Sequence, residues 1–226
     1  EDYRACTKSV EIEVAAGTAL GTAGREGQNA LDIWLYDGRI EALAYANPER
    51  LWSADNDLAP LHITCPVDYF DATAKTVLEA KLGSESTPRT VEPICGEVMQ
   101  DIAGTAQGKW YYASTSETGE DPHLALVHDN FDPTKGAFSV GTSVPTISDK
   151  VLYFTPAGSG RVNRDFSQVT ADGNTYCYDS LDGAPANTIV LVKLTSATAL
   201  TIEARSAASC GSGPWAFTGS AVSFER

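Results

Sequence analysis

From residue 95 onward, the chain is a series of short strand-like runs separated by turn residues. The runs are rich in Val, Ile, Leu, Tyr and Phe, and Gly, Pro, Asp and Asn lie between them. They cover residues 109–113, 123–128, 137–140, 150–154, 175–178, 188–194, 199–204 and 215–224. Strands at near-regular spacing with such turns are typical of an all-β sandwich or barrel. The sequence therefore predicts a mostly β fold, a sandwich or barrel of short antiparallel strands.

The first half of the chain carries fewer strand signals. Residues 10–14 alternate between polar and apolar side chains, and 61–65 is a short apolar run. Asp37-Gly38 lies between two further runs, 31–36 and 39–45. An Asp-Gly pair between two strand-like runs is typical of a two-residue hairpin turn, because a type I′ turn needs positive φ at both central positions. We therefore expect a β-hairpin over 31–45.

One helix is expected, over about residues 71–82. Asp68 or Asp71 can cap its N-terminus, and Gly83 suits the position after its end. The apolar stripe consists of Val77, Leu78 and Leu82. The sequence thus predicts one α-helix packed on the β structure.

Domain organisation follows from length and from the loop after the helix. The chain has 226 residues, enough for one large β domain or two small ones. Residues 84–94 contain Pro88 and Pro93 and resemble a linker. We predict a single domain over 1–226, and a split into two lobes near 84–94 is the alternative.

The cysteines predict disulfides. The five are Cys6, Cys65, Cys95, Cys177 and Cys210, and no C-x-x-C pair or zinc-finger spacing occurs among them. Their order along the chain suggests Cys65–Cys95 and Cys177–Cys210, which leaves Cys6 free or linked to another chain. Each bridge closes a loop of about 30 residues, which is worth on the order of 3 kcal/mol. Five reduced, buried thiols are the alternative.

Charge excludes some partners. The formal net charge is −14, so a polyanionic nucleic acid or an anionic membrane surface would be repelled. No run of 18 apolar residues occurs, and we expect no membrane insertion. Disulfides favour an oxidising compartment, so we predict the mature form of a secreted or periplasmic protein. No Asn-x-Ser/Thr sequon is present, which favours a bacterial source.

Two histidines and several aspartates supply a candidate catalytic or metal site. His128, Asp129 and Asp132 lie close together at the end of a predicted strand, and His62 is a candidate to meet them across a cleft. Imidazole and carboxylate groups serve in acid–base catalysis and hold calcium or another divalent metal. On a strand, His123 and His128 point to opposite faces, so His123 is left out of this set. The alternative is a hydrogen-bonded histidine beside an Asx turn.

Aromatic residues supply a candidate ligand surface. Trp110, Tyr111 and Tyr112 are consecutive, and Trp34 could join them across a sheet. Exposed rings on a β platform provide flat contacts for sugar rings or protein partners. Burial of these rings in the core is the alternative.

The chain lacks the G-x-S-x-G and G-x-G-x-x-G motifs and a Walker lysine. We therefore expect a secreted binding or assembly module that recognises a glycan or a protein partner, with self-association left open. The alternative is an extracellular hydrolase or lyase, metal-dependent or not, in which His62 and His128 converge in one pocket.

Overall fold

The computed structural model describes residues 11–15, 17–19, 33–51, 59–83, 88–116 and 121–226. The chain forms two compact units, residues 1–33 and 34–226. In the described part of the first unit, Thr18 N donates to Ala15 O over 3.0 Å, and residues 11–14 form no strand. The strand predicted over 10–14 is therefore wrong for these residues. The single-domain arrangement stays a prediction, and part of the predicted split at 84–94 lies outside the described residues.

Residues 108–225 contain eight antiparallel strands in one sheet. The strands are β1 (Gly108–Tyr112), β2 (Leu124–His128), β3 (Gly136–Val140), β4 (Lys150–Phe154), β5 (Tyr176–Tyr178), β6 (Thr188–Ser196), β7 (Ala199–Ser206) and β8 (Val222–Glu225). Their order across the sheet is β4-β3-β2-β1-β8-β7-β6-β5.

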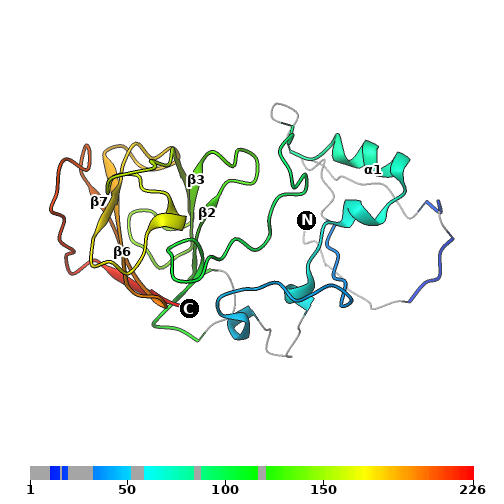
Figure 1. Cartoon of the computed structure of the whole chain (residues 1–226), viewed down its shortest axis with the longest axis horizontal. Helices are drawn as coiled ribbons and strands as arrows, with labels where there is room; N and C mark the ends of the chain where they lie inside the picture. Colours follow the sequence, from blue (N-terminus) through cyan, green and yellow to red (C-terminus); the bar gives the residue numbers. More distant parts are fainter. Residues whose placement is uncertain (1–10, 16, 20–32, 52–58, 84–87, 117–120) are drawn as a thin grey trace, which may run out of the picture. The chain divides into compact units, whose positions relative to one another are not determined.

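The sheet is a nearly closed barrel. An isolated bridge between Tyr153 of β4 and Asp182, just after β5, brings its two edges together. The strands, coloured green to red in Figure 1, curl around a common interior. The mostly β prediction is confirmed, and the barrel is the architecture that forms.

Alternate side chains of the strands fill the barrel. The interior includes Trp110, Leu126, Phe138, Val190 and Ile202, each 0% exposed. At the side of the barrel formed by β3, β4 and β5, four rings interlock with centroids 4.9–5.7 Å apart. They belong to Phe138, Phe154, Phe166 and Tyr178. Phe166 begins the 3₁₀ helix η4 (Phe166–Gln168), so this turn closes part of the interior.

A second, smaller cluster covers the outer face of β5 and β6. Cys177, Ile189, Leu191 and Cys210 are buried there, and Trp215 and Phe217 pack against them. Trp215 Nε1 donates to Cys210 O over 2.6 Å. Residues 215–217 therefore form a covering loop and no strand. The predicted last run is correct only for β8.

The hairpin predicted around Asp37-Gly38 is wrong. The turn itself is present, but its flanking residues hydrogen-bond to a third segment. Tyr36 forms a bridge with Ile63, and Leu43 N donates to Leu61 O over 2.8 Å. That third segment begins with the 3₁₀ helix η2 (Ala59–His62), which corrects the strand predicted over 61–65. Both flanks satisfy their backbone groups through a partner that is distant in sequence. Residues 31 and 32 lie outside the described part.

The predicted helix is α1 (Ala72–Glu79), which follows the 3₁₀ helix η3 (Pro66–Tyr69). Of the two predicted caps, Asp71 is the one that forms, and its carboxylate accepts from Thr73 N and Ala74 N. No residue of α1 is buried, and Val77 of the predicted stripe is 54% exposed. Another 3₁₀ helix, η1 (Pro48–Leu51), lies earlier in the chain.

Both predicted disulfides form. Cys65 pairs with Cys95 and Cys177 with Cys210, with Cα–Cα distances of 5.8 and 5.9 Å. Cys6 lies outside the described residues. Among the residues that the structure describes, no helix has the length and apolar character needed to cross a bilayer.

Candidate functional site

A cavity of about 640 Å³ lies against the outer face of the barrel at β2 and β3. Because successive side chains of a strand point to opposite faces, Leu124 and Leu126 enter the core while Ala125 and Val127 face outward. These outward residues, together with Ser139 of β3, form the floor of the cavity. The barrel thus supplies a rigid wall.

The other walls come from segments outside the barrel. Trp34, Tyr45, Leu51, Pro60 and Ile63 line the cavity from one side. Val98, Gln100 and Asp101 line it from the segment that leads into β1. Trp34 and Val98 remain 69% and 55% exposed, so the cavity carries apolar groups that are open to solvent.

Asp101 ties two of these segments together. Its Oδ2 accepts from Ala46 N over 2.8 Å, and its Oδ1 accepts from Lys109 N over 2.7 Å. The carboxylate therefore joins the segment beside Tyr45 to the start of β1. Hydrogen bonds from backbone N–H groups to a charged acceptor are among the stronger ones in proteins. Both oxygens of Asp101 serve the construction of the cavity.

Arg50 attaches the segment that contains Tyr45 to the barrel. Its guanidinium carbon lies 4.8 Å from the centroid of the Tyr111 ring. Its Nη2 donates to Thr115 O over 3.1 Å, and its Nη1 lies 3.4 Å from Glu225 Oε1. This stacking contact covers a ring on the outer face of β1.

His123 is part of the cavity wall and is 4% exposed. Its Nδ1 accepts from Tyr112 N over 3.1 Å, which places the proton of the neutral ring on Nε2. Its ring meets Tyr111 edge to face, with centroids 5.0 Å apart. The strand geometry that separated His123 from His128 was correct, but it is His123 that lines the larger cavity. The residues next to His123 in the sequence could not indicate that it lines a cavity, because another wall is formed by distant residues such as Trp34, Tyr45 and Ile63.

Two acidic side chains at the cavity face solvent. Asp121 and Asp149 are exposed, and in the described part of the chain neither carboxylate has a side-chain hydrogen bond or ion pair. Both aspartates are hydrogen-bonded through their backbone to the end of β3. Thr142 N donates to Asp121 O, and Asp149 N donates to the neighbouring Gly141 O. Together with Lys109, the cavity is lined by three aspartates and one lysine. Its charge disfavours anionic ligands.

Tyr45 is a half-buried hydroxyl in the cavity wall. Burial raises the pKa of Tyr45 to about 12, and the neighbouring Asp101 carboxylate adds to the increase. The phenol is therefore neutral at physiological pH and can donate or accept one hydrogen bond.

The predicted catalytic histidines do not line this cavity. His62 Nδ1 lies 3.1 Å from Ile40 O. His128 Nδ1 lies 2.8 Å from Pro133 O, and its Nε2 lies 3.1 Å from Asp165 Oδ2. The structure therefore gives both imidazoles local partners and does not place them around one pocket. The catalytic role of His62, His128 and Asp129 stays a hypothesis.

Asp129 and Asp132 form a turn at the end of β2. Asp129 accepts from Phe131 N and Asp132 N, and Asp132 accepts from Thr134 N. The Thr134 hydroxyl, which also donates to the Asp132 carboxylate, and then the Thr134 backbone N–H lower the pKa of Asp132 below its usual range. The two carboxylates also line a smaller cavity of about 300 Å³, together with Tyr153 and Asp182. Within the described residues, no three His, Cys, Asp or Glu side chains form a cluster that could hold a metal ion, and the role of His128, Asp129 and Asp132 as ligands of calcium or another divalent metal stays a hypothesis.

The predicted aromatic surface needs a correction. Trp110 is 0% exposed and donates from Nε1 to Ala106 O, and Tyr111 is 2% exposed beneath Arg50. Tyr112 is half-buried and packs on Phe224. Both faces of β1 are covered, so its three consecutive rings form no exposed platform. Trp34 is the one of the four predicted ligand-binding aromatics that is both exposed and in the cavity.

Comparison with known proteins gave no match: no family model, no curated protein and no solved structure is significantly similar to this chain.

Proposed function

We propose that this protein is a secreted or periplasmic binding module that takes an uncharged glycan into the cavity beside Trp34. The observation that carries the proposal is an exposed tryptophan at a cavity whose walls also present hydroxyl groups and solvent-facing carboxylates. An aromatic ring offers a flat apolar face to a sugar, and the polar groups can bond its hydroxyls.

The size and charge of the cavity support this class of ligand. Its volume of about 640 Å³ falls within the range of roughly 300–1,000 Å³ that small-molecule sites occupy. The excess of aspartates over lysine disfavours phosphorylated or carboxylated ligands. An uncharged oligosaccharide fits a cavity of this volume and carries no negative charge for the aspartates to repel.

Two disulfides support export. Structural disulfides persist in oxidising compartments and are rare in reducing ones. Both bridges connect segments that are about 30 residues apart, and one lies on the wall of the barrel itself.

A glycan array followed by calorimetry tests the proposal. We expect at least one neutral oligosaccharide to bind, and Trp34→Ala to weaken its binding at least tenfold, which corresponds to about 1.4 kcal/mol. Phe131→Ala is the matched control, because Phe131 is 50% exposed and does not line the cavity. An array without hits, or equal effects of the two variants, would contradict the proposal.

A further inference from the structure

We propose that the Cys65–Cys95 disulfide is a reducible site that controls the cavity, so that a dithiol reductant switches ligand binding off. The ligand part of this inference rests on the proposed function. The coupling between the disulfide and the walls of the cavity does not depend on it.

The two cysteines lie beside residues that line the cavity. Ile63 is two positions before Cys65, and Val98 is three positions after Cys95. Pro60 and Gln100 extend the same two walls. The bridge therefore joins, through a covalent bond, two chain segments that both line the cavity.

One of these segments is fixed to the barrel. The Gln100 side chain pairs with the backbone of His128: its Oε1 accepts from His128 N over 2.8 Å, and its Nε2 donates to His128 O over 3.0 Å. Glu97 N donates to Asn130 Oδ1 over 2.9 Å, and Asn130 Nδ2 donates to Glu97 O. Residues 97–100 thus keep their place on the end of β2 whether or not the disulfide is intact.

The other segment, residues 61–64, is hydrogen-bonded to the chain around residues 35–37. Asp37 N donates to His62 O, and Thr64 N donates to Leu35 O. Residues 61–64 are therefore held by the segment that carries Trp34. Once the disulfide is cut, the wall that contains Trp34 and Ile63 loses its covalent tie to the wall that contains Val98. Within the described part of the chain, the hydrogen bond from Ala46 N to Asp101 and the contacts of Arg50 are then the ties that hold it, so these two segments can move together relative to residues 97–100.

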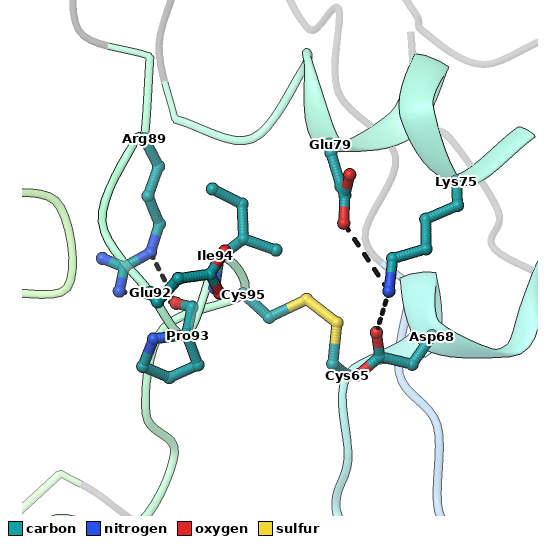
Figure 2. Close-up of a disulfide and its surroundings, with 9 residues drawn as sticks. All are labelled: Cys65, Asp68, Lys75, Glu79, Arg89, Glu92, Pro93, Ile94 and Cys95. Carbon is teal, nitrogen blue, oxygen red and sulfur yellow. Dashed lines mark hydrogen bonds and ion pairs between the residues drawn. A yellow bond between two sulfur atoms is a disulfide. The ribbon is translucent and has the colours of Figure 1, made fainter. Parts of the chain in front are cut away.

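The disulfide is accessible, unlike the second one. Cys65 and Cys95 are both partly exposed, whereas Cys177 and Cys210 are 0% and 7% exposed. Figure 2 shows the bridge between two polar groups of side chains, with Arg89 on one side and Lys75 on the other. Arg89 donates to Pro93 O, and Lys75 pairs with Asp68 over 2.6 Å. Lys75 is also paired with Glu79, so the charges beside the bridge largely cancel and leave the approach of a thiolate open.

The chemistry is thiol–disulfide exchange. A thiolate of the dithiol reductant attacks one sulfur, the S–S bond breaks, and the departing cysteine thiolate takes a proton. The second thiol of the reductant then closes its own disulfide and releases the other cysteine. Two electrons and two protons pass to the protein, which gains two thiols, and the reductant is oxidised to its cyclic disulfide.

The test is mild reduction of the full chain with dithiothreitol, followed by iodoacetamide labelling and peptide mapping. We expect Cys65 and Cys95 to be labelled before Cys177 and Cys210. In that partly reduced protein, backbone amide exchange of Ala46, whose N–H donates to Asp101, should rise at least tenfold, whereas that of Thr64, which bonds within the segments that move together, should change little. Binding of the neutral glycan found on the array should weaken at least tenfold, while the far-ultraviolet β spectrum is retained.

A double variant, C65S/C95S, should reproduce both changes without reductant. Unchanged exchange and unchanged affinity after selective reduction would overturn the proposal, as would simultaneous reduction of both disulfides. If the oxidised protein binds no glycan but amide exchange still rises on selective reduction, the proposed function fails and the control of the cavity walls by the disulfide is supported.

Discussion

At the scale of single residues, Asp101 shows how one side chain shapes the cavity. Its two oxygens bond the backbone on both sides, and Gly108 provides the space that it needs. Gly108 has a φ of +120°, and a Cβ there would overlap Asp101 Oδ1 and lie 2.7 Å from Asp101 Cα. Glycine is required at this position for both its backbone conformation and its lack of a side chain.

Gly108→Ala should therefore lower the free energy of unfolding by at least about 3 kcal/mol, through backbone strain and loss of the Asp101 hydrogen bonds. Gly104→Ala is the matched control, because Gly104 also has positive φ, at +74°, but nothing lies near its missing Cβ. We expect it to cost about 1 kcal/mol. Urea unfolding measures both, and equal costs would contradict the role given to Asp101.

Residue types alone suggested Trp34 as a ligand-binding aromatic residue, but they did not indicate which residues surround it. Trp110 and Tyr111 have the same local signal as an exposed aromatic pair, but Trp110 points into the barrel interior and Tyr111 is covered by Arg50 on the outer face of β1. Arg50 lies about 60 residues earlier, so no pattern within one strand contains this contact. The position of His123 in the cavity wall likewise depends on residues that are distant in sequence.

At the scale of elements, α1 is a helix whose N-cap matters more than its packing. None of its residues is buried, and Asp71 satisfies two N–H groups of its first turn. Such a helix draws little stability from the rest of the fold and should open locally.

Asp71→Ala should destabilise α1 by about 1 kcal/mol, and amide exchange over residues 73–80 should then rise about fivefold with little change in the global unfolding midpoint. Asp68→Ala is the control. Asp68 was the other predicted cap, but it makes only an exposed ion pair with Lys75, which is worth under about 1 kcal/mol. An equal rise in exchange for Asp68→Ala would show that the cap is assigned to the wrong residue.

Elements with local causes could be predicted, and elements that depend on distant partners could not. The strand at 150–154 matches β4, and the helix forms within its predicted range, because apolar runs and a cap are local signals. The Asp37-Gly38 turn is also local, but the pairing of its flanks was decided by Leu61 and Ile63. The covering loop at 215–217 is apolar because it packs on Cys177 and Leu191, which imitates a strand signal.

At the scale of the whole molecule, buried phenols make stability sensitive to alkaline pH. Burial, first, and a hydrogen bond with Asp172, second, raise the pKa of Tyr176 to about 12. Burial raises the pKa of Tyr178 well above its usual value, and it raises the pKa of Tyr45 to about 12. The folded state therefore holds these protons more tightly than the unfolded state does, for which the pKa is about 10.

The sign of the effect follows from linkage. The stability that these tyrosines contribute is fully present below pH 10 and is lost as the pH rises through 12. Absorbance at 295 nm should show a group of phenols in the native protein that ionise only near pH 12, whereas the chain in guanidinium should titrate near pH 10. Superimposable native and denatured titration curves would contradict this prediction.

The central claim is that Trp34 is the ligand-binding tryptophan of a barrel-side cavity, and indole N–H resonances in a ¹H–¹⁵N spectrum test it most directly. The chain has four tryptophans, and the indole N–H groups of Trp110 and Trp215 already donate to backbone carbonyls. On titration with the neutral glycan found on the array, we expect a saturable shift of the Trp34 signal, with those of Trp110 and Trp215 unmoved. A Trp34 signal that stays in place while the glycan binds, or a shift at Trp215 in its stead, would contradict it.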